Sequence, residues 1–140
     1  MIQANELRIG NWIEDRDTGR IGVVSLISKE EVVLNLKKSR VWLYFEDLKP
    51  IPLTEEILLK CGFEKVEVEV DEYYDCSYEK QLNSDVFISY ADDFSCSLFG
   101  DKCDSLKAYG VLPDWQSTNT VHGLQNLHYI LTGQELKIEL

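Results

Sequence analysis

With 140 residues, 44% hydrophobic and 28% charged residues, and a formal net charge of −11, the chain has the size and balance of one ordinary globular domain. That balance excludes an intrinsically disordered chain, which would contain fewer hydrophobic residues. The sequence does not open with a basic segment followed by an apolar run, and no apolar stretch reaches membrane-spanning length. We therefore expect a cytoplasmic protein without a signal peptide and without membrane association.

The acidic charge is confined to one part of the chain. Residues 1–53 hold eight acidic and eight basic residues, whereas residues 54–140 hold the other 17 acids and only 6 bases. An acidic surface of that kind repels phosphate backbones, so we expect no direct nucleic-acid binding. The asymmetry suggests two lobes, at 1–53 and 54–140, joined in one compact unit.

Short strands and turns alternate through the first of these lobes. Apolar and β-branched runs at 8–15, 21–27, 31–36 and 41–48 are separated by polar turns, and Pro50 and Pro52 end the pattern. So few strands hide both faces of a sheet only by curling into a barrel. We predict a small SH3-like β-barrel in this lobe.

The second lobe begins and ends with helix signals. Thr54 is placed as an N-cap and Gly62 as a C-terminal glycine around a short apolar face. A longer helix follows Asn119 or Thr120 and stops at Gly133, because Val121, Leu124, Leu127 and Leu131 recur at helical spacing.

Between the two helices the sequence alternates as strands do. Residues 64–74 predict a half-buried strand with an acidic outer face, and 85–90 with 94–100 predict a hairpin around Ala91–Asp93. We read 77–85 as a turn, 100–119 as an ordered loop with a helical turn, and 135–140 as a closing strand. The predicted fold class is α+β, with the SH3-like barrel packed on an antiparallel sheet with two helices.

Three blocks resemble a known family. NELRIGNWI (5–13), KPIPLTEEILLKCGF (49–63) and VHGLQNLHYILTGQEL (121–136) are similar to a family of uncharacterised small proteins encoded in phages and mobile elements of gut bacteria. Relatives read His-Gln-Leu-Gln-Asn-Leu where this chain has Gly123 in place of the first glutamine. The resemblance implies a cytoplasmic accessory protein of a mobile element, and it implies no catalytic residue and no cofactor.

The residues that could support catalysis or metal binding lack the required spacing. His122 and His128 lie six apart, on different helix faces, and no cysteine pair has the C-x-x-C spacing of a zinc site. We expect the four cysteines to be free thiols, with Cys61 and Cys96 buried. A small Cys/His hydrolase or transferase remains an alternative, and the preferred prediction is a protein that is not an enzyme and binds neither metal nor cofactor.

Two surfaces of the acidic lobe are candidates for binding a partner. His122, Asn126 and Tyr129 share one face of the final helix, opposite its leucines, where they either pack against the loop at 100–119 or meet a partner. Acidic residues on the strand and the hairpin could imitate the phosphate spacing of a nucleic acid, as an inhibitor of a host nucleic-acid-binding defence enzyme would. Acidic residues are also an ordinary means of solubility.

The barrel lobe is rich in aromatic residues. Trp42 and Tyr44 share one strand face and Phe45 lies on the other, so one set must be core, and the other could form an aromatic groove for a peptide. We therefore predict an accessory protein that binds another protein and leave a homo-oligomer open. The candidate partner-binding residues are Trp12, Trp42, Tyr44, Phe45, Glu67, Glu69, Asp71, Asp92, Asp93, His122, Asn126 and Tyr129.

Overall fold

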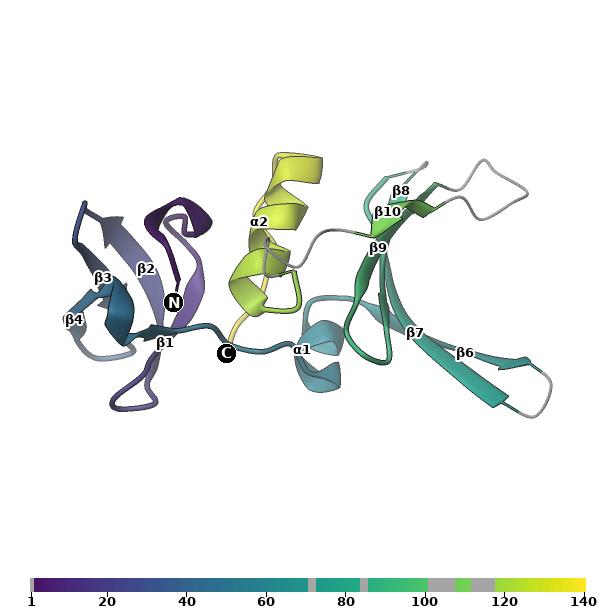
Figure 1. Ribbon diagram of the computed structural model, residues 1–140, viewed down its shortest axis with the longest axis horizontal. Helices are drawn as coiled ribbons and strands as arrows, with labels where there is room; N and C mark the ends of the chain where they lie inside the picture. The colour runs from purple at the N-terminus through teal and green to yellow at the C-terminus, as the bar shows by residue number, and fades with distance from the viewer. Residues whose placement is uncertain (1, 71–72, 84–85, 101–107, 112–117) are drawn as a thin grey trace.

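A computed structural model describes residues 2–70, 73–83, 86–100, 108–111 and 118–140 of the chain. Two five-stranded antiparallel sheets lie on either side of a central helix, as Figure 1 shows. The predicted α+β class, with a barrel-like N-terminal part, an antiparallel sheet and two helices, is confirmed.

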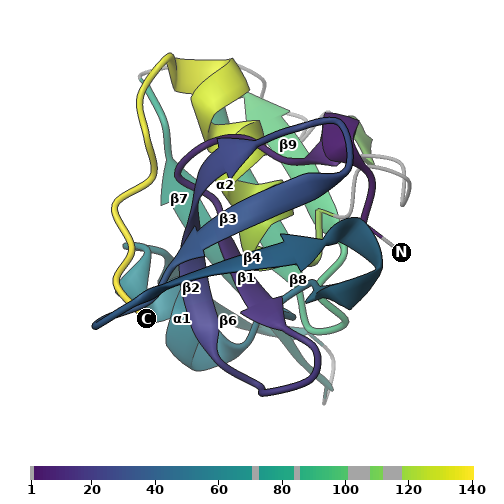
Figure 2. The same cartoon turned by 90° about the vertical axis from the view of Figure 1, so that its left-hand side faces the viewer.

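The first sheet curls strongly into a small half-barrel, which faces the viewer in Figure 2. Its strand order is β4-β3-β2-β1-β5, and the 3-10 turn η2 (Phe45–Asp47) connects β4 to β5, which lie at opposite ends of that order. A second 3-10 turn, η1 (Ala4–Glu6), precedes the barrel. The strands are β1 (Trp12–Asp15), β2 (Ile21–Ile27), β3 (Glu31–Asn35), β4 (Arg40–Tyr44) and β5 (Leu48–Lys49).

Alternation along these strands fills the interior of the barrel. Successive side chains of a strand point to opposite faces, so every second apolar residue turns inward. The core residues Ile13, Val24, Val32, Leu34 and Leu48 are fully buried in this way.

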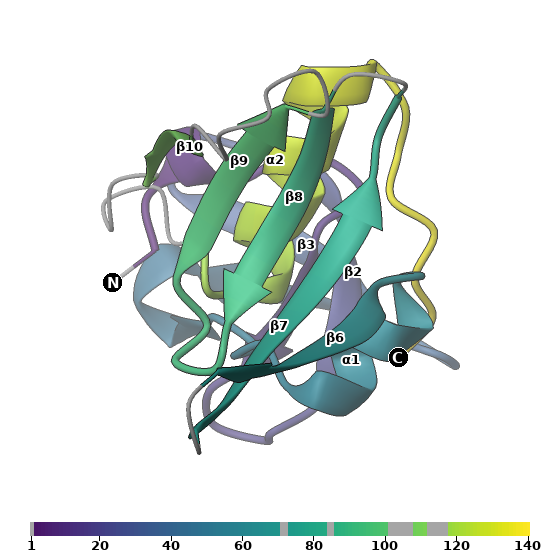
Figure 3. The same cartoon turned by 90° about the vertical axis from the view of Figure 1, so that its right-hand side faces the viewer.

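The second sheet has the order β10-β9-β8-β7-β6 and covers α2 on the side opposite the barrel (Figure 3). Its β8 and β9 form the expected hairpin around Ala91–Asp93. The strands are β6 (Glu64–Val70), β7 (Tyr73–Gln81), β8 (Val86–Ala91), β9 (Cys96–Gly100) and β10 (Ala108–Val111).

The predicted turn at 77–85 is wrong, because β7 runs through most of it. β7 pairs with β6 on one side and β8 on the other, and Tyr78 is buried in the core. Lys80 shares a strand face with the buried Tyr78, where its ammonium donates to the Cys61 carbonyl at 2.8 Å, and Glu79 lies on the opposite face, so the charged residues are accommodated within the strand.

The two helices start and stop as predicted. In α1 (Glu55–Lys60), the Thr54 hydroxyl accepts a hydrogen bond from the Ile57 N–H at 3.3 Å, and Gly62 has a φ of 86°. In α2 (Val121–Thr132), the Thr120 hydroxyl accepts from the Gly123 N–H at 3.2 Å, and Gly133 has a φ of 69°. Both glycines occupy the left-handed region that ends helices.

Two further expectations for the second lobe are corrected. Residues 135–140 form no strand. Leu136 is buried, and Ile138 and Leu140 pack against the same core, so the alternating apolar residues reflect packing on the core and not pairing with another strand. Residues 108–111 form β10, whereas 101–107 and 112–117, where a helical turn was expected, lie outside the described residues. Neither helix of the described chain has the length and apolarity needed to span a bilayer.

Candidate functional site

Three large apolar side chains are exposed on the outer surface of the barrel. Trp42 is 60% exposed, Tyr44 54% and Leu26 42%. With Val33 and Arg40 beside them, these residues form what we call the outer aromatic face. Clustered exposed apolar residues, unlike single ones, are typical of interaction surfaces.

The register of the sheet aligns this face. Leu26 lies opposite Val33, and Val33 lies opposite Trp42, so the three side chains form one row across β2, β3 and β4. Directly opposed side chains in antiparallel strands contact one another. Val33 is therefore only 5% exposed although it points away from the barrel core.

Strand parity decides which aromatic residues are outside. Val41 and Leu43 turn inward and pack against the barrel core, which leaves Trp42 and Tyr44 outside. Phe45 is half-buried and packs against the same core, so it belongs to the interior set. The other predicted aromatic residue, Trp12, is half-buried and packs against the second core.

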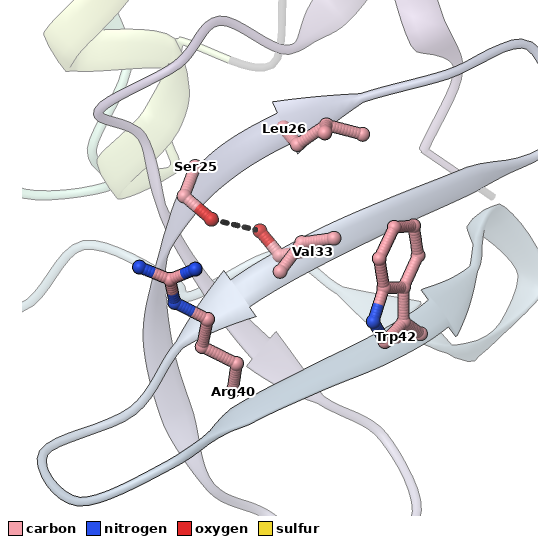
Figure 4. Close-up of a pocket in the computed structure, with 5 residues that line it drawn as sticks. All are labelled: Ser25, Leu26, Val33, Arg40 and Trp42. Carbon is pink, nitrogen blue, oxygen red and sulfur yellow. Dashed lines mark hydrogen bonds between the residues drawn. The ribbon is translucent and has the colours of Figure 1, made fainter.

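A bulge in β2 brings Leu26 to the outer face. Val24 is buried inside the barrel, and simple alternation would bury Leu26 as well. The register shifts between Val24 and Leu26, and the extra residue, Ser25, donates its hydroxyl to the Val33 carbonyl at 3.2 Å (Figure 4). The sequence did not predict Leu26 as a surface residue, because no residue type in this strand indicates a bulge.

The outer aromatic face has a depression between Arg40 and Trp42. This depression, of about 250 Å³, is lined by Ser25, Leu26, Val33, Arg40 and Trp42, as Figure 4 shows. The Trp42 indole and the Arg40 guanidinium stand at its two ends, and Val33 lies between them (Figure 4).

Positive charge gathers at the turn that joins β3 to β4. Two further depressions border this turn, and the larger, of about 620 Å³, is lined by Trp12, Gly19, Arg20, Ile21, Asn35, Leu36, Lys37, Lys38, Ser39 and Leu140. Neither contains an acidic residue. We call Arg20, Lys37, Lys38 and Arg40 the cationic turn; within the described chain, only Arg20 of these forms an ion pair, with Asp15 at 3.5 Å.

The predicted polar face of α2 is engaged with the N-terminal segment. The Gln125 side chain accepts a hydrogen bond from the Trp12 N–H at 2.9 Å and donates to the Gly10 carbonyl at 3.0 Å. Asn126 accepts from the Asn11 side-chain amide at 3.0 Å and donates to the Glu6 carbonyl at 2.7 Å. We call these contacts the polar seam.

Arg8 extends the seam to the end of α2. Its guanidinium donates to Asn126 at 3.3 Å, pairs with Glu135 and lies 3.8 Å from the centre of the Tyr129 ring. Tyr129 remains partly exposed. In the described chain these side chains thus contact residues 6–12, where sequence reasoning expected the loop at 100–119.

His122 lies inside the molecule and not on a surface. It is 1% exposed, and its Nδ1 lies 3.1 Å from the Thr120 hydroxyl. Burial lowers its pKa from 6.5 to about 4, and the nearby Glu6 offsets only part of that effect. The imidazole is therefore neutral at physiological pH.

The second histidine contacts the backbone, and two of the cysteines are buried. His128 Nδ1 lies 3.0 Å from the Gln134 carbonyl, next to the end of α2. Cys61 and Cys96 are buried and free as predicted, and burial raises the pKa of each thiol to about 11. A nucleophilic cysteine must be a thiolate, whereas these thiols are protonated at neutral pH.

The predicted acidic residues divide between two elements. Glu67 and Glu69 are exposed on β6, and Lys65 on that strand pairs with Glu67 at 3.4 Å and with Glu55 at 3.3 Å.

Asp92 and Asp93 lie in the hairpin turn, where hydrogen bonding to Ser95 lowers the pKa of Asp93. Asp71 lies outside the described residues. Among the described residues, no group of three or more His, Cys, Asp or Glu is arranged to hold a metal ion.

Comparison of the chain with protein-family models, with curated proteins and with solved structures gives no match. The case for a function therefore depends on the geometry of the chain itself, and the outer aromatic face is the strongest candidate site.

Proposed function

We propose that this chain is a non-enzymatic accessory protein that binds another protein through the outer aromatic face of its barrel. The observation that carries the proposal is the exposed row of Leu26 and Trp42 over Val33, extended by Tyr44. Tryptophan and tyrosine are the residues most enriched at the centres of protein interfaces. The resemblance of the three sequence blocks adds the context of a phage or mobile element.

This proposal is preferred to mimicry of DNA by the acidic lobe. A mimic needs an uninterrupted array of carboxylates, but Lys65 lies within the acidic strand and pairs with Glu55 and Glu67. It is also preferred to cysteine catalysis, because burial keeps the Cys61 and Cys96 thiols protonated.

The proposal is tested by capture of partners from a host-cell lysate with the full chain as bait. Trp42→Ser should lose a partner that the unaltered protein retains, since it removes the largest exposed side chain of the face. Ile130→Ser is the matched control, because Ile130 is an exposed apolar residue on α2 that is not part of the outer aromatic face. Equal capture by all three proteins, with partners identified by mass spectrometry, would contradict the proposal.

A further inference from the structure

β4 is an edge strand of the barrel sheet. It ends the strand order, and among the described strands it pairs only with β3. The turn closes with the Leu36 N–H donating to the Ser39 carbonyl at 2.8 Å, which makes these two residues a hydrogen-bonded pair. Hydrogen-bonded and non-hydrogen-bonded pairs alternate along antiparallel strands.

That alternation determines which backbone groups point outward. Arg40, Trp42 and Tyr44 fall at non-hydrogen-bonded positions opposite Asn35, Val33 and Glu31, so their N–H and C=O groups point away from β3. The Tyr44 N–H is engaged by the Asp47 carboxylate at 3.3 Å. Within the described chain, no hydrogen bond engages the outward backbone groups of Arg40 and Trp42.

Arg40 and Trp42 present both an open backbone and an exposed side chain, and the exposed side chain of Tyr44 continues the row. A strand added along β4 would hydrogen-bond to Arg40 and Trp42, and every second side chain of that strand would lie beside Trp42 or Tyr44. Such a ligand is an extended peptide with apolar residues at alternate positions.

Charge along the edge is polarised. The Arg40 end carries the cationic turn, where Lys37, Lys38 and Arg40 form no ion pair with a described residue. The Tyr44 end carries carboxylates, because Glu31 lies opposite Tyr44 and Glu46 follows in η2. Complementarity therefore favours a peptide that is acidic at the end beside Arg40.

We propose that the β4 edge binds an extended peptide of a partner protein by strand addition, with apolar side chains beside Trp42 and Tyr44 and acidic ones at the cationic turn. This inference builds on the proposed function and names the chemistry of the partner. A peptide is favoured over a single-stranded nucleic acid because the open edge offers backbone donors and acceptors with which the backbone of an added strand would pair.

The test begins with selection from a library of random ten-residue peptides on the full chain. Enrichment of peptides that combine acidic residues with alternating apolar ones is expected. The affinity of a selected peptide should fall roughly tenfold in a Lys37→Glu/Lys38→Glu variant and weaken as salt increases. Lys29→Glu is the matched control, since Lys29 is an exposed lysine in the turn between β2 and β3.

Hydrogen bonding between the peptide backbone and β4 is tested separately, by N-methylation of the peptide. N-methylation of the selected peptide at every second residue should abolish binding in one register and have little effect in the other, because only alternate N–H groups of an added strand face β4. Equal effects of the two methylated peptides would overturn strand addition.

The remaining outcomes separate the inference from the proposed function. Selection of neutral or basic peptides that still require Trp42 would overturn the acidic ligand and leave the binding face standing. Failure to recover any peptide whose binding depends on Trp42 would count against both. Tighter binding of a ten-nucleotide oligothymidylate than of any selected peptide would overturn the inference in favour of a nucleic-acid ligand.

Discussion

The polar seam and the outer aromatic face differ in the residues that build them and in what those residues contact. In the seam, Gln125 and Asn126 direct their amides at backbone and side-chain groups of residues 6–12. On the face, Trp42 and Tyr44 leave most of their surface uncovered. A polar helix face can therefore be engaged inside the molecule, whereas an apolar strand face left on the outside is typical of interaction surfaces.

The difference should appear first in stability. We expect Gln125→Ala to lower the free energy of unfolding by about 3 kcal/mol, because it leaves the Trp12 N–H and the Gly10 carbonyl without their partner. Chemical denaturation monitored by circular dichroism measures the loss. Ile130→Ala, on the exposed side of the same helix, should change the free energy of unfolding little. If the two variants lose the same amount, Gln125 contributes no more to stability than an exposed side chain does.

Acidification should weaken the interior beside the seam. The pKa of His122 is about 4 in the folded protein, below its unfolded value of 6.5, so the unfolded chain binds the proton more readily. Above pH 6.5 the imidazole is neutral in both states, and the protein is at its most stable with respect to this group. As the pH falls from 6.5 to 4, protonation of His122 in the unfolded chain lowers the free energy of unfolding by up to roughly 3 kcal/mol.

Denaturant titrations of His122→Gln and of the unaltered protein across that pH range measure how much of the pH dependence of stability comes from His122. His128→Gln serves as the control and should retain the pH dependence. If His122→Gln and the unaltered protein lose stability in parallel, the buried imidazole is not its source.

Within the barrel, a tight backbone approach should be sensitive to a single methyl group. A Cβ at Gly22 would lie 2.9 Å from the Asn35 carbonyl oxygen and 2.9 Å from Leu36 Cδ2. Gly22→Ala should therefore destabilise the protein by about 2 kcal/mol. Thermal unfolding measures this effect, and an unchanged melting temperature would show that β2 and β3 move apart without strain.

The outer aromatic face should be the least sensitive region. We expect Tyr44→Ser to change the free energy of unfolding by less than about 0.5 kcal/mol, because Tyr44 is more than half exposed. Leu34→Ala, in the buried interior of the neighbouring strand, should cost about 3 kcal/mol in the same denaturation assay. A large loss for Tyr44→Ser would mean that the face supports the fold rather than a partner.

Local patterns in the sequence determined much of this architecture. The threonine caps and terminal glycines of both helices, the strands of the barrel and the hairpin around Ala91–Asp93 depend on nearby residues, and each was predicted correctly. The parity of Trp42 and Tyr44 against Phe45 likewise placed them on opposite faces. Strand and helix periodicity are properties of the local backbone, so they can be read directly from the sequence.

Only the tertiary structure decided which faces are covered. Parity could not tell whether Trp42 or Phe45 was core, because that depends on how the sheet curls. The bulge at Ser25 that exposes Leu26, the strand through 77–81 and the pairing of Gln125 with residues more than a hundred positions away all depend on long-range contacts. Such contacts are set by the packing of the whole chain, and local sequence carries no signal for them.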